Sequence, residues 1–304
     1  MSVLTDSTPT RDGAVTDIYH FTYGLLTPLL AYVMSCVGSA LGLLCTARAR
    51  GVTGAARVRW LALGAVSIGG TGIWVMHFIA MLGFTVSGST IRYDVGLTML
   101  SMAIAIVVVG VGLLIVGFSG ERLVPVLRAG TITGLGVAGM HYTGMAAVQV
   151  RGVIYYDHLV VAASIIIAVV AATAALLFAL RVRGPWATTA AALIMGVAVS
   201  GMHYTGMAAM SVRLDTVHGT LDGANALQFL LPLIIGISMV AGGLLGVIAL
   251  SPNEDELRAE AEMMERIANL ATTAPARHLQ RPRRQEPRED EPENARAVSY
   301  FDRR

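Results

Sequence analysis

Seven long apolar segments divide the chain and leave few folds open to it. The composition, 55% hydrophobic and 14% charged, indicates a membrane protein. Each segment exceeds the roughly 20 residues that a helix needs to cross the hydrocarbon core of a bilayer. Helices are expected because they satisfy their backbone polar groups within each segment. The predicted fold is an all-α, seven-helix transmembrane bundle, with spans near residues 24–46, 60–84, 95–117, 129–150, 159–180, 186–210 and 227–250.

Arginine sets the predicted orientation of the bundle, because the sequence contains no lysine. Eight arginines follow the first, third and fifth segments: Arg48, Arg50, Arg57, Arg59, Arg122, Arg128, Arg181 and Arg183. The opposite side carries only Arg11, Arg92, Arg151 and Arg213. By the positive-inside rule the first set is cytoplasmic. We expect an extracytoplasmic N-terminal segment at 1–20 without a cleaved signal peptide, a membrane domain at 21–250 and a cytoplasmic tail at 251–304.

A nine-residue motif recurs within the apolar segments. Gly-Met-His-Tyr-Thr-Gly-Met-Ala-Ala occupies 139–147 and 201–209, and a degenerate copy, Val-Met-His-Phe-Ile-Ala-Met, occupies 75–81. Aligning the copies also aligns three glycines that lie six residues before the central methionines: Gly70, Gly134 and Gly196. Related edges rich in Tyr and Asp precede the odd-numbered segments at 17–20, 92–94 and 155–158. The sequence therefore predicts three two-helix units followed by an unpaired seventh helix.

Each motif copy places one histidine between two methionines inside the membrane, where an ionisable side chain is costly and usually functional. All three motif helices run in the same direction, so their histidines are expected at one depth, in the outer half of the bilayer. The methionine four residues after each histidine shares its helical face. Imidazole with thioether is a ligand set that suits copper. The predicted metal ligands are His77, His141, His203, Met76, Met140, Met202, Met81, Met145 and Met207.

Other interpretations of these residues stay open. For a single copy, packing is the better explanation, since methionine fills gaps between helices and a membrane histidine can bond across to a neighbour. Three copies at matched depth favour a shared site. A haem protein with two of the histidines as axial ligands and a copper permease or store are the alternative functions. His20 and His158 are candidate accessory groups at the outer rim. Cys36 and Cys45, separated by about 13 Å of helix, are too far apart for a disulfide.

The motif resembles that of the MHYT domain, a bacterial integral-membrane sensory domain of seven helices named after Met-His-Tyr-Thr, over roughly residues 18–250. The resemblance implies a multi-pass protein of the bacterial cytoplasmic membrane that binds copper and, through it, senses oxygen, carbon monoxide, nitric oxide or redox state. It implicates the Met-His pairs Met76-His77, Met140-His141 and Met202-His203. The first copy departs from the pattern, because Phe78 and Ile79 replace the Tyr-Thr pairs of the other two copies.

The chain is expected to be a sensor rather than an enzyme, with no catalytic residue and no nucleic-acid partner. It lacks the lysine that a retinal Schiff base needs, and the hydroxyls of Thr143 and Thr205 are expected to bond backward to helix carbonyls. Many MHYT proteins continue into domains that make or degrade cyclic dinucleotides, but the tail at 251–304 is short for a domain. We expect a short helix near 252–270, disorder beyond residue 274, and output through a separate cytoplasmic signalling protein.

Overall fold

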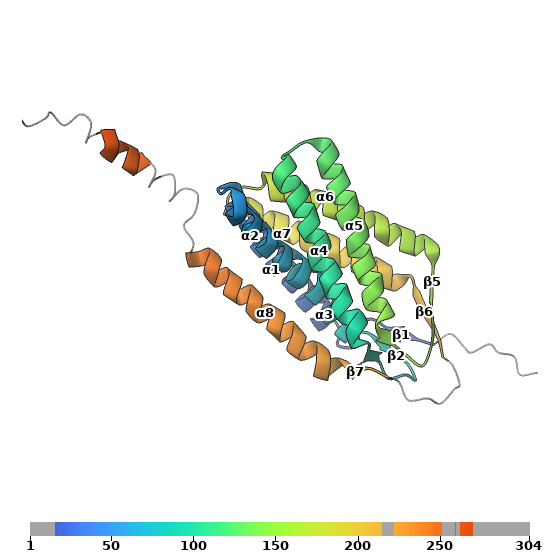
Figure 1. The fold of residues 1–304 in the computed structure, drawn as a ribbon. Helices are drawn as coiled ribbons and strands as arrows, with labels where there is room; N and C mark the ends of the chain where they lie inside the picture. Colours follow the sequence, from blue (N-terminus) through green and yellow to red (C-terminus); the bar gives the residue numbers. More distant parts are fainter. Residues whose placement is uncertain (1–15, 215–221, 251–258, 260–261, 270–304) are drawn as a thin grey trace, which may run out of the picture. The chain divides into compact units, whose positions relative to one another are not determined.

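The computed structural model describes residues 16–214, 222–250, 259 and 262–269. The chain divides into two compact units, Met1–Glu254 and Asp255–Arg304, and each is considered by itself. Among the described residues, seven helices are long and apolar enough to span a membrane, which confirms the predicted number (Figure 1). In chain order they are α1 (Leu26–Arg50), α2 (Gly54–Ala65) continued through η1 (Val66–Val75) and α3 (Met76–Leu82), α4 (Val95–Ser119), α5 (Leu123–Ala146), α6 (His158–Arg181), α7 (Pro185–Ala208) and α8 (Ala226–Leu250).

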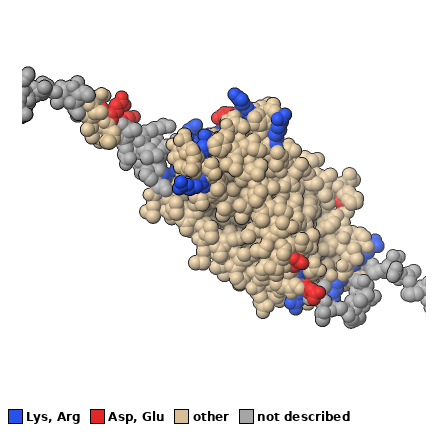
Figure 2. Space-filling model, viewed as in Figure 1, with Lys and Arg blue, Asp and Glu red and all other residues tan. Residues whose placement is uncertain are grey.

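The lateral surface of the bundle is apolar. Large side chains on the outer faces of α4, α6 and α8 are more than half exposed, among them Val107, Ile166 and Met239. Charged side chains gather toward the two ends of the bundle in the view of Figure 2. Contiguous exposed apolar surface of this extent marks a contact with a membrane or another protein. The fold is thus that of a multi-pass membrane protein.

Helix boundaries depart most clearly from the prediction in the second and fourth spans. α2 begins at Gly54 rather than near residue 60, so Arg57 lies within its first turn. Long basic side chains tolerate this position because they extend toward the aqueous end of the helix. α5 begins at Leu123 rather than 129. It ends at Ala146 rather than 150, because the next residues form a strand instead of a last helical turn. The other spans agree with the prediction to within four residues at either end.

Short antiparallel strands close each two-helix unit at one end of the bundle. β1 (Ile18–Tyr19), before α1, pairs with β2 (Thr85–Val86), after α3. β3 (Arg92–Tyr93) pairs with β4 (Val148–Gln149) to close the unit of α4 and α5, and β5 (Gly152–Tyr156) pairs with β6 (Met210–Leu214) to close the unit of α6 and α7. β7 (Ala224–Asn225), directly before α8, also pairs with β3. The three repeats are therefore strand–helix–helix–strand units, and α8 is the unpaired helix.

We call this end of the bundle the strand end. The opposite end, which carries the connections from α1 to α2, α4 to α5 and α6 to α7, is called the arginine end. Two of its arginines bond to the ends of neighbouring helices. Arg50 donates to the carbonyls of Ala179 (2.6 Å) and Val182 (2.9 Å) at the end of α6, and Arg48 donates to the Ile248 carbonyl of α8 at 3.1 Å. Cations are favoured at helix C-termini, where carbonyls lack helical partners.

The repeated Tyr-Asp edge of the second and third units is a strand residue followed by a helix cap. Asp94 Oδ1 accepts a hydrogen bond from the Leu97 N–H at 2.8 Å at the start of α4. Asp157 Oδ1 accepts from the N–H groups of Leu159 (2.8 Å) and Val160 (3.2 Å) at the start of α6. An acidic cap satisfies free backbone donors and complements the positive end of the helix dipole.

The ten-residue π-helix η1 interrupts the second span directly before the first motif. Its glycines allow close approach to two neighbours. A Cβ at Gly69 would lie 2.6 Å from the Ala105 carbonyl oxygen of α4, and a Cβ at Gly38 of α1 would overlap the backbone of Gly72. π-helical turns are rare in proteins, and those that occur are often found at functional sites. A continuous α-helix was predicted here, and the wider turn was not.

In the second unit, residues 259 and 262–269 are helical, within the range predicted for a short helix. The disorder predicted beyond residue 274 and most of the N-terminal segment at 1–20 lie outside the described residues. Cys36 and Cys45 are free thiols, as predicted.

Candidate metal centre

Three buried histidines converge in the interior of the bundle, one from each motif. His77 belongs to α3, His141 to α5 and His203 to α7, and none is more than 1% exposed. The Nδ1 atom of His77 lies 3.0 Å from Nδ1 of His203 and 3.2 Å from Nδ1 of His141. One ring nitrogen of each histidine lies within 4.8 Å of those of the other two. These residues, the triad, form a cluster that can hold one metal ion.

The three imidazole rings form a nearly regular arrangement. Their centroids are 4.9, 5.0 and 5.2 Å apart, and each pair of ring planes is almost perpendicular, at 83° to 85°. Each ring also meets the next residue of its motif edge to face, with centroid distances of 4.7 Å to Phe78 and 4.9 Å to Tyr142 and Tyr204. Such pairs are favourable for aromatic rings. Phe78 therefore preserves the packing of the motif and removes only its hydroxyl.

The spacing of the Nδ1 atoms fits a single ion. Metal–nitrogen bonds of about 2.0–2.1 Å at trigonal or tetrahedral angles place the ligand nitrogens roughly 3.3–3.6 Å apart. The separations of 3.0 and 3.2 Å lie just below this range. An opening of about 0.3 Å would bring the nitrogens to coordination distance. The same separations also fit hydrogen bonds between the rings. In either case Nδ1, rather than Nε2, is the ring nitrogen that faces the other rings.

Two glycines of the motif make room for the rings. A Cβ at Gly144 would lie 2.7 Å from Nε2 of His77, and a Cβ at Gly206 would overlap Nε2 of His141. Both Nε2 atoms are buried and have no hydrogen-bond partner among the described residues. The Nε2 side of the ring from the preceding motif thus packs against each glycine, and the Nδ1 side faces the centre of the triad. Sequence reasoning missed this role, although both glycines stand three residues after a histidine.

The six predicted methionine ligands are all buried, at 1–2% exposure: Met76, Met81, Met140, Met145, Met202 and Met207. They do not all face one space. Met81 lines a groove at the strand end, whereas Met202 lines an apolar cavity on the arginine-end side of the triad. The histidines are brought together by the fold, and methionine coordination remains a prediction.

Hydroxyl groups of the motifs bond to the helices around them. Thr205 Oγ1 donates to the Gly201 carbonyl at 2.7 Å, the backward bond that was predicted. The Tyr142 hydroxyl shares a 2.7 Å hydrogen bond with Ser164 of α6. Both groups therefore stabilise helix packing, and neither is arranged as a nucleophile beside a general base.

Of the two accessory histidines, only His20 lies near the motifs. Its ring is 5.8 Å from that of Phe84, and the adjacent Phe21 ring is 5.7 Å from that of Tyr204. Burial lowers the pKa of His20, so at neutral pH its ring is uncharged and does not oppose a cation nearby. His158, the first residue of α6, is exposed and does not join the triad.

Comparison with known proteins agrees with this architecture. Residues 70–130 and 134–192 match the MHYT family, described as a bacterial signalling protein N-terminal repeat. The two ranges begin at Gly70 and Gly134, which the internal alignment had paired. No solved structure matches the chain.

Three relatives are signalling proteins. The chain is 38% identical over 189 residues to the bifunctional diguanylate cyclase/cyclic di-GMP phosphodiesterase MucR of Pseudomonas aeruginosa, covering 60% of this chain and 27% of the relative. It is 34% identical over 205 residues to the cyclic di-GMP phosphodiesterase NbdA of the same species, covering 66% and 26%. It is also 34% identical over 230 residues to an uncharacterized signaling protein of Caulobacter vibrioides, covering 74% and 27%. The chain spans about a quarter of the length of these relatives. It therefore carries the MHYT domain of bacterial signalling proteins, matched here in two repeats.

Proposed function

We propose that the protein is a membrane sensor in which the triad holds one copper ion and presents it to a small ligand. The observation that carries the proposal is the convergence of His77, His141 and His203 from three repeats on one buried point, with Nδ1 separations close to those of a metal site. Three ionisable rings at one place inside an apolar bundle are hard to explain as packing, because burying polar groups without full hydrogen bonding is costly.

The donor set favours copper. Imidazole suits copper, zinc, iron and nickel, and the thioethers of the buried methionines in the same motifs favour reduced copper among them. Calcium and magnesium prefer oxygen ligands, and no carboxylate belongs to the cluster among the described residues. Asp94 and Asp157, the acidic residues of the repeated Tyr-Asp edges, are engaged as helix caps.

Haem is a poorer fit to the same residues. Two axial nitrogens bound on opposite faces of a haem lie about 4 Å apart, twice a metal–nitrogen bond of about 2.0 Å. The Nδ1 atoms of the triad are closer than this, at 3.0 and 3.2 Å, and three rings rather than two meet there. A copper permease is also disfavoured, since the space on the arginine-end side of the triad has an almost wholly apolar lining.

Different residues have different roles in such a site. Bound copper supplies an exchangeable coordination position for oxygen, carbon monoxide or nitric oxide, or a one-electron redox couple. The triad supplies the nitrogens, Gly144 and Gly206 set the tilt of two rings, and the aromatic residues that follow the histidines exclude water. A change in coordination alters the spacing of α3, α5 and α7, which is the differential contact that a switch requires.

We further propose that the arginine end faces the cytoplasm and the strand end faces outward. His77 lies five residues from the end of α3 at Leu82 and 23 residues from the start of α2 at Gly54, so this orientation places the triad in the outer half of the bilayer. The arginine distribution supports it through the positive-inside rule. We also propose that a change at the triad is passed to a separate cytoplasmic signalling protein.

Metal analysis combined with an absorption spectrum of the purified full chain tests the proposal. About one copper per chain without a Soret band is expected. His158→Ala is the control variant and should bind copper as the wild type does, because His158 is exposed and lies outside the triad. A Soret band would replace copper with haem, and protein that binds neither after expression in copper-supplemented medium would refute a metal function for the triad.

A further inference from the structure

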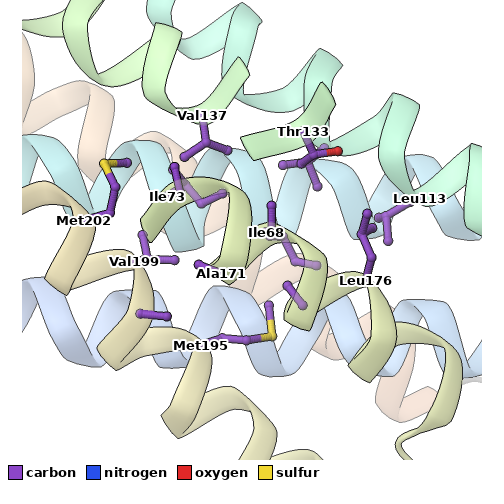
Figure 3. A pocket seen from close by; sticks show the side chains of 15 residues that line it. Ile68, Ile73, Leu113, Thr133, Val137, Ala171, Leu176, Met195, Val199 and Met202 are labelled. Carbon is purple, nitrogen blue, oxygen red and sulfur yellow. The ribbon is translucent and has the colours of Figure 1, made fainter. Parts of the chain in front are cut away.

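An apolar cavity lies about one helical turn from the triad, toward the arginine end. Figure 3 shows the side chains that line it. Each motif helix lines it with the residue four positions before its histidine: Ile73, Val137 and Val199. In α5 and α7, residues four apart share a helical face, and four residues of α-helix rise about 6 Å. Ile73 lies in η1, three residues before α3 begins. The cavity and the triad are therefore stacked between the same three helices.

The cavity is built to exclude water. Its volume is about 50 Å³, whereas a cavity needs roughly 10–15 Å³ to admit one water-sized molecule. Thr133 is the one polar residue in its lining, and the Thr133 hydroxyl already donates to the Val108 carbonyl at 3.3 Å. A buried water needs two to four polar partners. The space is thus large enough for a molecule of a few heavy atoms and suits only an apolar one.

Small side chains of α6 leave room for this space. Ala168, Ala171, Ala172 and Ala175 all line it, together with the larger Leu176. Protein interiors contain few voids larger than a water molecule, and a void lowers stability because its lining loses packing contacts. A void of this size beside a buried histidine cluster indicates a use beyond packing.

Only small side chains separate the cavity from the lipid-facing surface of the bundle between α6 and α7. Ala171 of α6 and Ala198 of α7 both line the cavity, and both are only partly buried. Apolar molecules concentrate in hydrocarbon rather than water, so the lipid phase is the natural source of an occupant. The opposite boundary is Met202, which lines the cavity and immediately precedes His203.

We propose that this cavity is a binding site for a small apolar molecule that enters from the lipid phase between α6 and α7, and that Met202 couples its occupancy to the triad. The coupling rests on the proposed metal function, but the binding does not. The site would thus hold the sensor's ligand one turn away from the metal position, in the chemical environment where such a molecule is most soluble.

Xenon tests the binding directly, because it fills apolar cavities and needs no metal. We expect xenon-129 exchange spectra of the metal-free full chain in detergent to show a saturable bound population. Ala172→Leu, which fills the cavity from a helix without a motif, should reduce bound xenon at least tenfold. The matched control is Ala163→Leu, because Ala163 is an exposed residue of the same helix outside the lining. Ala175→Val provides a smaller filling change should Ala172→Leu not fold.

The coupling is read in the copper-loaded protein. Xenon pressure should shift the copper absorption or paramagnetic resonance spectrum of the wild type and of Ala163→Leu, and leave that of Ala172→Leu unchanged. Equal xenon binding in Ala172→Leu and the wild type, or none in either, would overturn the cavity as a ligand site. Xenon binding without a spectral shift would overturn the coupling alone, and absence of copper would count against the proposed function while the metal-free measurement still decides the cavity.

Discussion

Replacing Gly144 with alanine adds one methyl group against the back of the His77 ring and should weaken copper binding severely. The added Cβ would lie 2.7 Å from His77 Nε2, where ordinary contact begins at 3.4 Å, so the ring must retreat by about 0.7 Å. Metal–ligand distances tolerate only about 0.2 Å. The ring cannot turn freely, because Phe78 and the other two imidazoles contact it.

The magnitude follows from comparing these effects. Changing a residue that orients a metal ligand costs about 10–100-fold in affinity, and here the ligand is pushed beyond its tolerance, so we expect a loss of at least about 100-fold, or roughly 2.7 kcal/mol. Overpacking costs about 1–3 kcal/mol of stability, while alanine for glycine within a helix returns about 0.5–1 kcal/mol. The metal-free protein should therefore be destabilised by no more than about 2.5 kcal/mol.

Competition titration with a copper chelator, together with thermal melting of the metal-free protein, separates the two quantities. Gly139→Ala is the matched control: it lies in the same motif and helix, and a Cβ there would meet nothing within 4 Å. It should gain about 0.5–1 kcal/mol of stability and keep wild-type affinity. Wild-type copper affinity in Gly144→Ala would refute the idea that this glycine positions the His77 ring.

Further outcomes are expected from other parts of the molecule. Alanine at His77, His141 or His203 should each abolish most copper binding in the same titration, since one ion needs all three; an unaffected variant would remove that residue from the site. Asp157→Ala removes the cap of α6 and should lower stability by about 1 kcal/mol in a thermal melt, with copper retained; a change in copper content would link the cap to the centre. A membrane-impermeant chelator should strip copper faster from intact cells than from inside-out vesicles, and the opposite order would reverse the proposed orientation. In a reporter assay, deleting residues 275–304 should preserve signalling, whereas deletion from 252 onward should abolish it and leave copper in place; normal signalling by both would place the output elsewhere.

Hydropathy predicted the number and approximate limits of the seven helices, because a bilayer leaves the backbone few ways to satisfy its polar groups. It did not predict where α5 ends, since the apolar Val148 belongs to strand β4. It also missed η1. That π-helix is accompanied by close contact of Gly69 and Gly72 with two other helices, and such tertiary contacts leave no local periodicity in the sequence.

The triad was predictable because the motif repeats at nearly constant spacing, so similar helices carry His77, His141 and His203 to the same place. The choice of Nδ1 was not predictable, because it depends on ring orientation. The fit of Gly206 to the His141 ring was equally hidden, since a glycine shows what it makes room for only when the neighbouring helix is in position.

The strand pairs that close the repeats give each motif helix a pinned end close to the triad. In the continuous helix α5, His141 lies five residues from Ala146, beside strand β4, whereas Leu123 lies 23 residues from Ala146. A helix held at one end acts as a lever, and this ratio of arms enlarges a movement more than fourfold. An opening of about 0.3 Å at the histidines would become roughly 1–2 Å at the arginine end, given the uniform rise of an α-helix. Proteins switch between states through shifts of about 1–2 Å at helix interfaces. A displacement of less than 1 Å at the triad would therefore produce a displacement of switching size at the arginine end.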